Sequence, residues 1–223
     1  MQITRGVFVT GTDTEVGKTY VSCRLLEMLR RQGLRTTAMK PIASGAEKIK
    51  GRYVNDDALR LQQAASVDAP YAQVNPYVFA EAIAPHIAAE RAGVEIDFEI
   101  IRQSYQSLSE LSDFVLVEGV GGWLVPLNAQ QTLADLATML ALPVLLVVGM
   151  RLGCINHALL SVAAIEQSGL YLQGWIANKL QGNYPCVNEN IETLQQHIEA
   201  PLLATLEYEI KAETVPDIKL AGT

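Results

Sequence analysis

The sequence VFVTGTDTEVGKT at residues 7–19 places a glycine-rich loop directly after an apolar run. A phosphate-binding loop needs small residues whose backbone N–H groups surround the anion, a lysine that reaches the outer phosphates, and a neighbouring hydroxyl for Mg²⁺. Gly17, Lys18 and Thr19 supply these features in that order. A helix that begins at Gly17 would add the partial positive charge of its N-terminus. The stretch therefore predicts a nucleotide-binding loop between a strand and a helix.

This loop departs from the common phosphate-binding pattern in its spacing. Five residues, not four, separate Gly11 from Gly17, so Thr12 stands where the first glycine usually lies. A glycine-rich turn that binds nothing is the simpler interpretation of such a segment. The order of strand, loop, Gly-Lys-Thr and amphipathic helix favours nucleotide binding instead.

The composition predicts one domain over residues 1–223 and a small molecule, or another copy of the chain, as the partner. With 49% hydrophobic and 18% charged residues, a chain of this length can form one substantial core. We see neither a leader segment nor an apolar run long enough for a membrane span, so we expect a cytoplasmic protein with no membrane partner. A net charge of −7 disfavours a nucleic-acid partner, which would need a basic stripe. Cys23, Cys154 and Cys186 are far apart in sequence, and we expect reduced, buried thiols.

Apolar runs alternate with amphipathic segments along the chain. This pattern predicts an α/β fold, P-loop NTPase-like, with a mostly parallel central sheet flanked by helices on both faces. The segments 42–54 and 70–85 have the composition of irregular structure. We expect strands at 7–10, 36–39, 114–117, 144–148, 174–177 and 202–204, and helices at 17–32, 55–63, 86–91, 97–111, 133–140, 156–167 and 187–197.

Ligands of parallel α/β sheets bind at the carboxyl ends of the strands. The phosphate loop, residues 40–44, 118–122 and 149–156, and Asn178 should therefore face one crevice. Glu118 follows a run that is expected to be buried on both faces, where a nucleotide enzyme places the acid that holds Mg²⁺. This favours a metal ligand, with Thr19 as its partner, over a solvated loop carboxylate. Asp57 or Asp56 could add a second carboxylate, but both are equally suited to capping a helix.

Lys40 lies at an expected strand end, beside Pro41. A second fixed cation suits phosphoryl transfer, in which negative charge spreads over the equatorial oxygens, although an ordinary surface lysine fits the position equally well. The N–H groups at the helix start within residues 149–156 could bind a carboxylate or phosphate, but a plain glycine-containing connection is the simpler interpretation. The histidines (His86, His157 and His197) have no metal-ligand spacing, and Trp123 and Trp175 border glycines at strand boundaries; we expect structural roles for all five.

Taken together, several motifs resemble the dethiobiotin synthetase family, whose ATP-dependent members close the ureido ring in biotin biosynthesis. The similarity spans nearly the whole chain, and the set of motifs in this order is specific although each motif alone is weak. The motifs are residues 11–19 (GTDTEVGKT), 40–45 (KPIASG), 75–77 (NPY), 84–86 (APH), 117–123 (VEGVGGW) with Pro126-Leu127, and 152–157 (LGCINH).

The resemblance implies a reaction and a set of partners. The substrate would be 7,8-diaminononanoate, bound across the subunit boundary of a homodimer. CO₂ would add to one amine to give a carbamate, ATP would phosphorylate the carbamate with the help of Mg²⁺, and the second amine would close the ring and release phosphate.

The resemblance also implies roles for individual residues. Lys18 and Lys40 would be catalytic, and Thr19, Asp57 and Glu118 would hold Mg²⁺. The substrate would contact Thr14, Glu15, Ser44 and the backbone of Gly153, Cys154, Ile155 and Asn156. ATP would contact Glu15, Val16, Gly17, Lys18, Thr19, Tyr20, Asp57, Glu118, Gly119, Val120, Gly121, Asn178 and Lys179, with Asn178 at the adenine.

Two positions depart from the family pattern. Residues 203–208 (LATLEY) contain neither the glycine nor the proline that commonly stands beside the base, which puts the adenine wall and nucleotide selectivity in doubt. Asn190 stands where related chains can present a tyrosine to the substrate carboxylate, which leaves more of that contact to the backbone site.

Two other classes share this type of loop. Partition and septum-positioning ATPases carry an extra lysine early in the loop, and here that place is Asp13, so the required cation is missing. Amidotransferase-type ligases of cobalamin synthesis have an added glutaminase domain, for which this chain looks too short.

Overall fold

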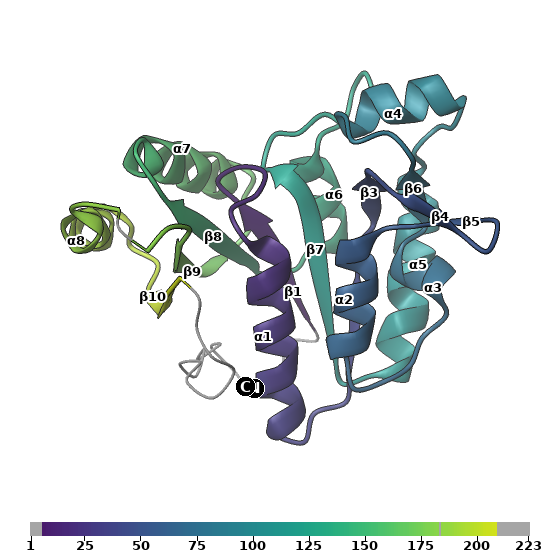
Figure 1. The fold of residues 1–223 in the computed structure, drawn as a ribbon, viewed down its shortest axis with the longest axis horizontal. Helices are drawn as coiled ribbons and strands as arrows, with labels where there is room; N and C mark the ends of the chain where they lie inside the picture. Colours follow the sequence, from purple (N-terminus) through teal and green to yellow (C-terminus); the bar gives the residue numbers. More distant parts are fainter. Residues whose placement is uncertain (1–5, 183, 209–223) are drawn as a thin grey trace.

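A six-stranded parallel sheet forms the centre of the protein (Figure 1). The computed structural model describes residues 6–182 and 184–208, so both ends of the predicted domain over residues 1–223 lie outside the described residues. The strand order is β10-β9-β8-β1-β7-β2, with β8 and β1 in the middle. The strands are β1 (Gly6–Gly11), β2 (Thr36–Met39), β7 (Phe114–Gly122), β8 (Val144–Met150), β9 (Leu172–Lys179) and β10 (Leu202–Leu206).

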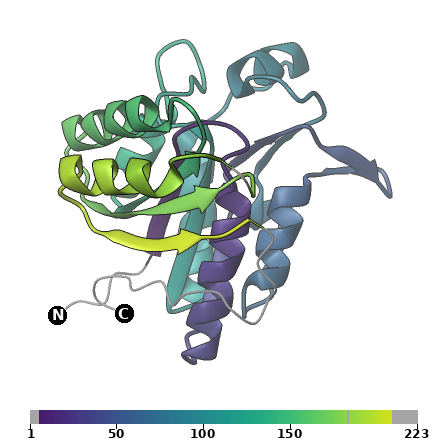
Figure 2. The same ribbon diagram turned by 60° about the vertical axis from the view of Figure 1, so that its left-hand side comes forward.

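Helices cover both faces of this sheet because its strands are apolar on both sides. In β7, Val115 and Val117 join one buried cluster, whereas Phe114 and Leu116 join another. The second cluster contains residues of α1 (Lys18–Arg31) and α2 (Asp56–Ala64), and the first contains residues of α5 (Phe98–Leu111), α6 (Leu133–Leu140), α7 (Cys154–Gln167) and α8 (Val187–His197). Figures 1 and 2 show these helices on the two sides of the sheet. The predicted α/β class is therefore confirmed.

The prediction of irregular structure at 42–54 and 70–85 is wrong. The first segment contains β3 (Ile42–Ser44) and a hairpin of β4 (Glu47–Ile49) and β5 (Arg52–Val54), which projects from the body in Figure 1. The second segment contains α3 (Tyr71–Val74) and β6 (Tyr77–Phe79), which pairs with β3, and α4 (Pro85–Ala92) begins at its end. Each of these strands is three residues long, too short for an alternating pattern to stand out. Lys50 and Gly51 have φ values of 49° and 84°, as a two-residue hairpin turn requires.

Several smaller expectations also need correction. The strand that we expected at 114–117 continues to Gly122 in β7. Of the cysteines that we expected to be buried, Cys154 is buried and Cys23 is half-buried, but Cys186 is exposed. The three histidines lie in α4, α7 and α8 as expected, and both tryptophans are buried in the core. No helix within residues 6–182 and 184–208 has the length and apolar character needed to cross a membrane.

Candidate active site

The phosphate loop is held against β8 and β9. Thr12 N–H donates to the carbonyl of Val147 at 3.0 Å, and Asn178 Nδ2 donates to the carbonyl of Val16 at 2.9 Å. Gly17, which precedes α1, has a φ of 85°, and a Cβ placed there would lie 2.2 Å from Asn178 Nδ2. Both the backbone conformation and the close approach require glycine at this position. The loop therefore has a fixed shape with Lys18 and Thr19 at the start of the helix.

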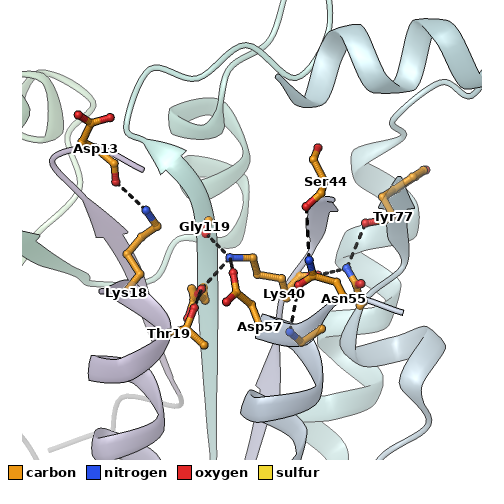
Figure 3. A network of polar contacts seen from close by, with 12 residues as sticks. Asp13, Lys18, Thr19, Lys40, Ser44, Asn55, Asp57, Tyr77 and Gly119 are labelled. Carbon is orange, nitrogen blue, oxygen red and sulfur yellow. Dashed lines mark hydrogen bonds and ion pairs between the residues drawn. The ribbon is translucent and has the colours of Figure 1, made fainter. Parts of the chain in front are cut away.

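Lys18 bends back toward its own loop. Its Nζ donates to the carbonyl of Asp13 at 2.8 Å (Figure 3). Burial lowers the pKa of Lys18 to about 8, and the positive charge of Lys40 acts in the same direction. A phosphate group placed here would favour the charged form of Lys18.

A buried cluster of opposite charges lies where β2 and β7 meet, with the ammonium of Lys40 at its centre (Figure 3). Lys40 Nζ contacts Glu118 Oε1 at 2.6 Å, the Gly119 carbonyl at 3.1 Å and Asp57 Oδ2 at 3.3 Å. The side chains of Lys40 and Glu118 are 4% and 0% exposed.

Burial alone would lower the pKa of Lys40, but the charges of Glu118 and Asp57 outweigh it and raise that pKa. Burial likewise opposes ionisation of Asp57, whose pKa is nevertheless lowered by Lys40. Lys40 is therefore a fixed cation, and not the surface lysine that the sequence left open.

The oxygen atoms around this cluster fit Mg²⁺ in part. Thr19 Oγ1 donates to Glu118 Oε1 at 2.8 Å, and the buried Glu118 Oε2 has no hydrogen-bond partner within the described part of the chain. Hydroxyl and carboxylate oxygens are the ligands that Mg²⁺ prefers. No group of three or more His, Cys, Asp or Glu side chains suited to a metal occurs among the described residues. Thr19, Asp57 and Glu118 would therefore hold Mg²⁺ together with phosphate oxygens of a nucleotide, as Mg²⁺ sites commonly do.

A cavity of about 730 Å³ opens over the cluster. Its wall includes the apolar residues Ala43, Ile83, Pro85 and Val125. The buried Ser44 Oγ has no hydrogen-bond partner within residues 6–182 and 184–208. The predicted site residues that line the cavity are Thr14, Glu15, Gly17, Lys18, Thr19, Tyr20, Lys40, Ser44, Asp57, Glu118, Val120 and Gly121.

The other predicted site residues lie around the cavity. Val16 is fully buried in the phosphate loop, and the Gly119 carbonyl faces Lys40. Asn178 is buried beneath the loop, and Lys179 Nζ pairs with Glu207 at 2.6 Å. Residues 153–156 begin α7, where Gly153, with a φ of 92°, is the N-cap. The roles of these residues toward adenine and the substrate carboxylate stay predictions.

Sequence reasoning missed several residues that shape this site. Asn75 Nδ2 donates to the Lys40 carbonyl at 2.7 Å and to the Tyr77 carbonyl at 3.0 Å, so it connects the backbone just before Pro41 to the start of β6. Tyr71 donates to Asn75 Oδ1 at 2.9 Å and accepts from Asn55 N–H at 2.8 Å. Arg60, one turn beyond Asp57 on α2, lines the cavity. The motif at residues 75–77 was the available signal for Asn75, but it carried no indication of a role.

The fold and the phosphate loop define a P-loop nucleotide-binding protein. Two solved structures share the fold: the septum site-determining protein MinD of Pyrococcus horikoshii, complexed with Mg-ADP (18% identity, 91% of this chain and 81% of that chain, TM-score 0.55), and the cell division protein FtsY of Thermotoga maritima (17%, 95% and 65%, TM-score 0.53). A family model described as an AAA domain matches residues 5–215.

Much closer relatives are named ATP-dependent dethiobiotin synthetase BioD. The protein of Aromatoleum aromaticum is 52% identical over 91% of this chain and 90% of its own length, and that of Pseudomonas aeruginosa UCBPP-PA14 is 51% identical over 88% and 86%. The BioD 1 protein of Salmonella typhi is 48% identical over 92% and 90%. This chain belongs to the ATP-dependent dethiobiotin synthetase family, whose members are ligases of biotin biosynthesis.

Proposed function

We propose that this protein converts 7,8-diaminononanoate, CO₂ and ATP to dethiobiotin, ADP and phosphate in a Mg²⁺-dependent reaction. The observation that carries the proposal is one cavity with a charged floor and an apolar wall. The floor holds Lys18, Lys40, Asp57 and Glu118, and residues 82–85 contribute to the wall. A substrate with two amines on an aliphatic chain matches this combination, and its triphosphate co-substrate matches the loop.

The bond changes divide into three steps. One amine adds to CO₂, a C–N bond forms, and the amine loses a proton to give a carbamate. A carbamate oxygen attacks the γ-phosphorus of ATP, and the bond to the ADP oxygen breaks. The second amine attacks the carbamate carbon, the C–O bond to phosphate breaks, and loss of a proton leaves the cyclic urea.

The residues of this chain would act mainly by position and charge. Lys18 and Lys40 would stabilise the negative charge on the transferring phosphoryl group, because both are held at fixed positions in a largely buried floor. Mg²⁺ held by Thr19, Asp57 and Glu118 would neutralise charge on the phosphates. Thr14, Glu15 and the unpartnered hydroxyl of Ser44 would border the diamine and carbamate, which brings the carbamate into line with ATP.

The far end of the substrate would lie at a second subunit. The N–H groups at the start of α7, near Gly153, would bind its carboxylate in a homodimer. Asn190 would contribute little to binding of this carboxylate, because its Nδ2 already donates to Tyr184 Oη at 3.0 Å. A cytoplasmic location and the absence of nucleic-acid partners belong to the same proposal.

The assay that tests the proposal measures dethiobiotin and phosphate together. We expect phosphate release to require both 7,8-diaminononanoate and CO₂ and to match dethiobiotin in a ratio of about one. ATP hydrolysis that proceeds without the diamine and gives no cyclic urea would overturn it.

A further inference from the structure

An ion pair joins the phosphate loop to the start of α7. Arg151 Nη2 contacts Asp13 Oδ2, and the two residues are 138 positions apart in the chain. Arg151 directly follows β8, and its carbonyl accepts from Cys154 N–H at 3.0 Å in the turn that leads into α7. The side chain of one residue therefore links the nucleotide loop to the segment that we assign to the substrate carboxylate.

Asp13 uses three of its oxygen atoms to organise the loop. Its carbonyl accepts from Lys18 Nζ at 2.8 Å, and its Oδ1 accepts from Thr14 N–H at 2.7 Å. Its Oδ2 is the atom that pairs with Arg151. The orientation of the Asp13 carboxylate thus depends on Arg151, and the same carboxylate fixes the backbone just before Glu15.

The inserted part of the loop has little other support. On one side of these inserted residues, Thr12 N–H donates to the Val147 carbonyl. On the other side, Val16 packs closely against Gly149, where an added Cβ would lie 2.8 Å from the Val16 side chain. Thr14 and Glu15 between them are exposed, and Glu15 has a φ of 59°, a conformation that is uncommon for a residue other than glycine. The ion pair connects Asp13, whose carboxylate holds the Thr14 N–H, to a residue outside the loop.

We propose that Arg151 is a positioning residue for the second substrate: through Asp13 it holds Thr14 and Glu15 in place and couples them to the start of α7. This inference rests on the proposed function, since it concerns the diamine that Thr14 and Glu15 would border. The backbone of Gly17, Lys18 and Thr19, which would bind the phosphates of ATP, is held at the start of α1 and beside Asn178 by contacts that do not involve Arg151. The pair also gives Asp13 a role at the position where partition ATPases carry a lysine.

The size of the effect follows from the exposure of the pair. The side chains of Arg151 and Asp13 are 42% and 44% exposed, and pairs of this kind are modest in strength. We therefore expect Arg151→Met to raise the KM for 7,8-diaminononanoate by about 3- to 10-fold, with the KM for ATP changed by less than about 2-fold.

The test compares five variants with the wild type: Arg151→Met, Asp13→Asn, the double variant, Arg151→Lys and Arg102→Met. Asp13→Asn keeps the acceptor for Thr14 N–H and removes the charge, so it should reproduce the Arg151→Met effect. The double variant should show no further increase, because the two residues act as one unit. Arg151→Lys should recover most of the wild-type KM. Arg102→Met is the matched control, since Arg102 and Glu99 form a pair of similar exposure (43% and 48%) within helix α5.

Hydrogen exchange of the ligand-free protein supplies a readout that needs no turnover. Amides of residues 14–16 should exchange faster in Arg151→Met and Asp13→Asn than in the wild type or Arg102→Met. An equal rise in both KM values, additive effects in the double variant, or unchanged exchange at residues 14–16 would overturn the inference. A wild-type protein that forms no dethiobiotin would refute the proposed function instead, and the exchange result would still report on the ion pair.

Discussion

At the scale of single residues, the central fact of the site is that its charges neutralise one another in the free protein. Lys40 is nearly surrounded by protein, and both of its carboxylate partners, Glu118 and Asp57, lie within 3.3 Å of its Nζ. An unpaired charge at such a position would be strongly unfavourable. The ion pair therefore makes it possible for Lys40, the proposed catalytic cation, and Glu118, the proposed metal-binding carboxylate, to lie in the core of the protein.

Removal of Lys40 should affect stability and catalysis separately. Lys40→Met leaves Glu118 buried without a cation, and we expect a loss of about 3–5 kcal/mol in the free energy of unfolding, measured by urea titration. The double variant Lys40→Met/Glu118→Gln should recover a large part of this loss, because both charges are gone. Equal stability of the single and double variants would show that Glu118 is not destabilised by the missing lysine.

Turnover should respond to Lys40 even where the protein remains folded. For Lys40→Ala, we expect dethiobiotin formation to fall by about 10²-fold or more while ATP still binds, because the lost interaction stabilises mainly the transition state. The measurements are single-turnover rates and ATP affinity by calorimetry, at a temperature where the variant is folded. Turnover near the wild-type value would contradict a catalytic role and indicate that Lys40 is only structural.

Lys18 should make nucleotide binding depend on pH. Its pKa of about 8 in the free protein lies below the ordinary 10.5, so part of the population is neutral at pH 8. Bound phosphates favour the charged form, so ATP binding should take up about half a proton at pH 8 and more at pH 9, and affinity should fall as the pH rises above 8. Calorimetry in buffers of different ionisation enthalpy measures this uptake. No uptake at pH 8–9 would contradict the shifted pKa.

The residues of the site were only partly predictable. Lys40 and Glu118 could be placed at one edge of the sheet from their strands, but the contact between their side chains spans 78 positions in the chain and carries no sequence signal. The hydrogen bond from Asn178 Nδ2 to the Val16 carbonyl likewise carries no sequence signal, because the two residues are 162 positions apart. Local motifs indicate which residues carry the chemistry, whereas the partners that hold them follow only from the packed structure.

At the scale of elements, α2 shows how a helix start can organise a site. Asn55 caps α2 by accepting from Ala58 N–H at 3.3 Å, and its Nδ2 donates to the Ser44 carbonyl at 3.4 Å. The cap therefore sets both the first turn of α2, which carries Asp57, and the end of β3, which carries Ser44. The Asn-Asp-Asp run at residues 55–57 is a local signal for a helix start, but it left the capping residue open among the three, and the structure has Asn55 in that position.

The Asn55 cap yields a prediction about stability and metal dependence. Asn55→Ala should lower the free energy of unfolding by about 1 kcal/mol and raise the Mg²⁺ concentration needed for half-maximal activity, because Asp57 loses its fixed position. Asn55→Asp is the matched control, since it retains the cap acceptor. Urea titration and a Mg²⁺ titration of activity provide the two measurements, and an unchanged Mg²⁺ response in Asn55→Ala would separate the cap from the metal site.

The short elements around the site explain why prediction failed there. The β4–β5 hairpin is largely exposed, and its sequence EKIKGRYV lacks the apolar alternation of a half-buried strand. In contrast, the expected bounds of the strand at 36–39 and of the helix at 133–140 match the structure, because continuous apolar or amphipathic patterns mark them.

At the scale of the whole molecule, stability rests on two apolar layers that meet the sheet from opposite sides. Leu116 in β7 is fully buried in the layer beneath α1. Leu116→Ala should lower the free energy of unfolding by about 2–5 kcal/mol, whereas Ile100→Ala, at a position that is 46% exposed on α5, should change it by less than about 1 kcal/mol. Similar losses for both variants in urea titrations would contradict this assignment of the core.

The strand order also places two groups of proposed site residues toward different edges of the sheet. The phosphate loop and Lys40 follow β1 and β2, and Glu118 lies on their neighbour β7. Asn178 and residues 203–208 lie toward the opposite edge, on and just beyond β9 and β10. The proposed adenine contacts are therefore separated from the charge cluster by the width of the sheet. An exchange of residues 203–208 for the corresponding segment of a relative should change competition between ATP and other triphosphates and leave the Mg²⁺ requirement as it was. Such separation would let a family keep one reaction while its members adopt different nucleotides.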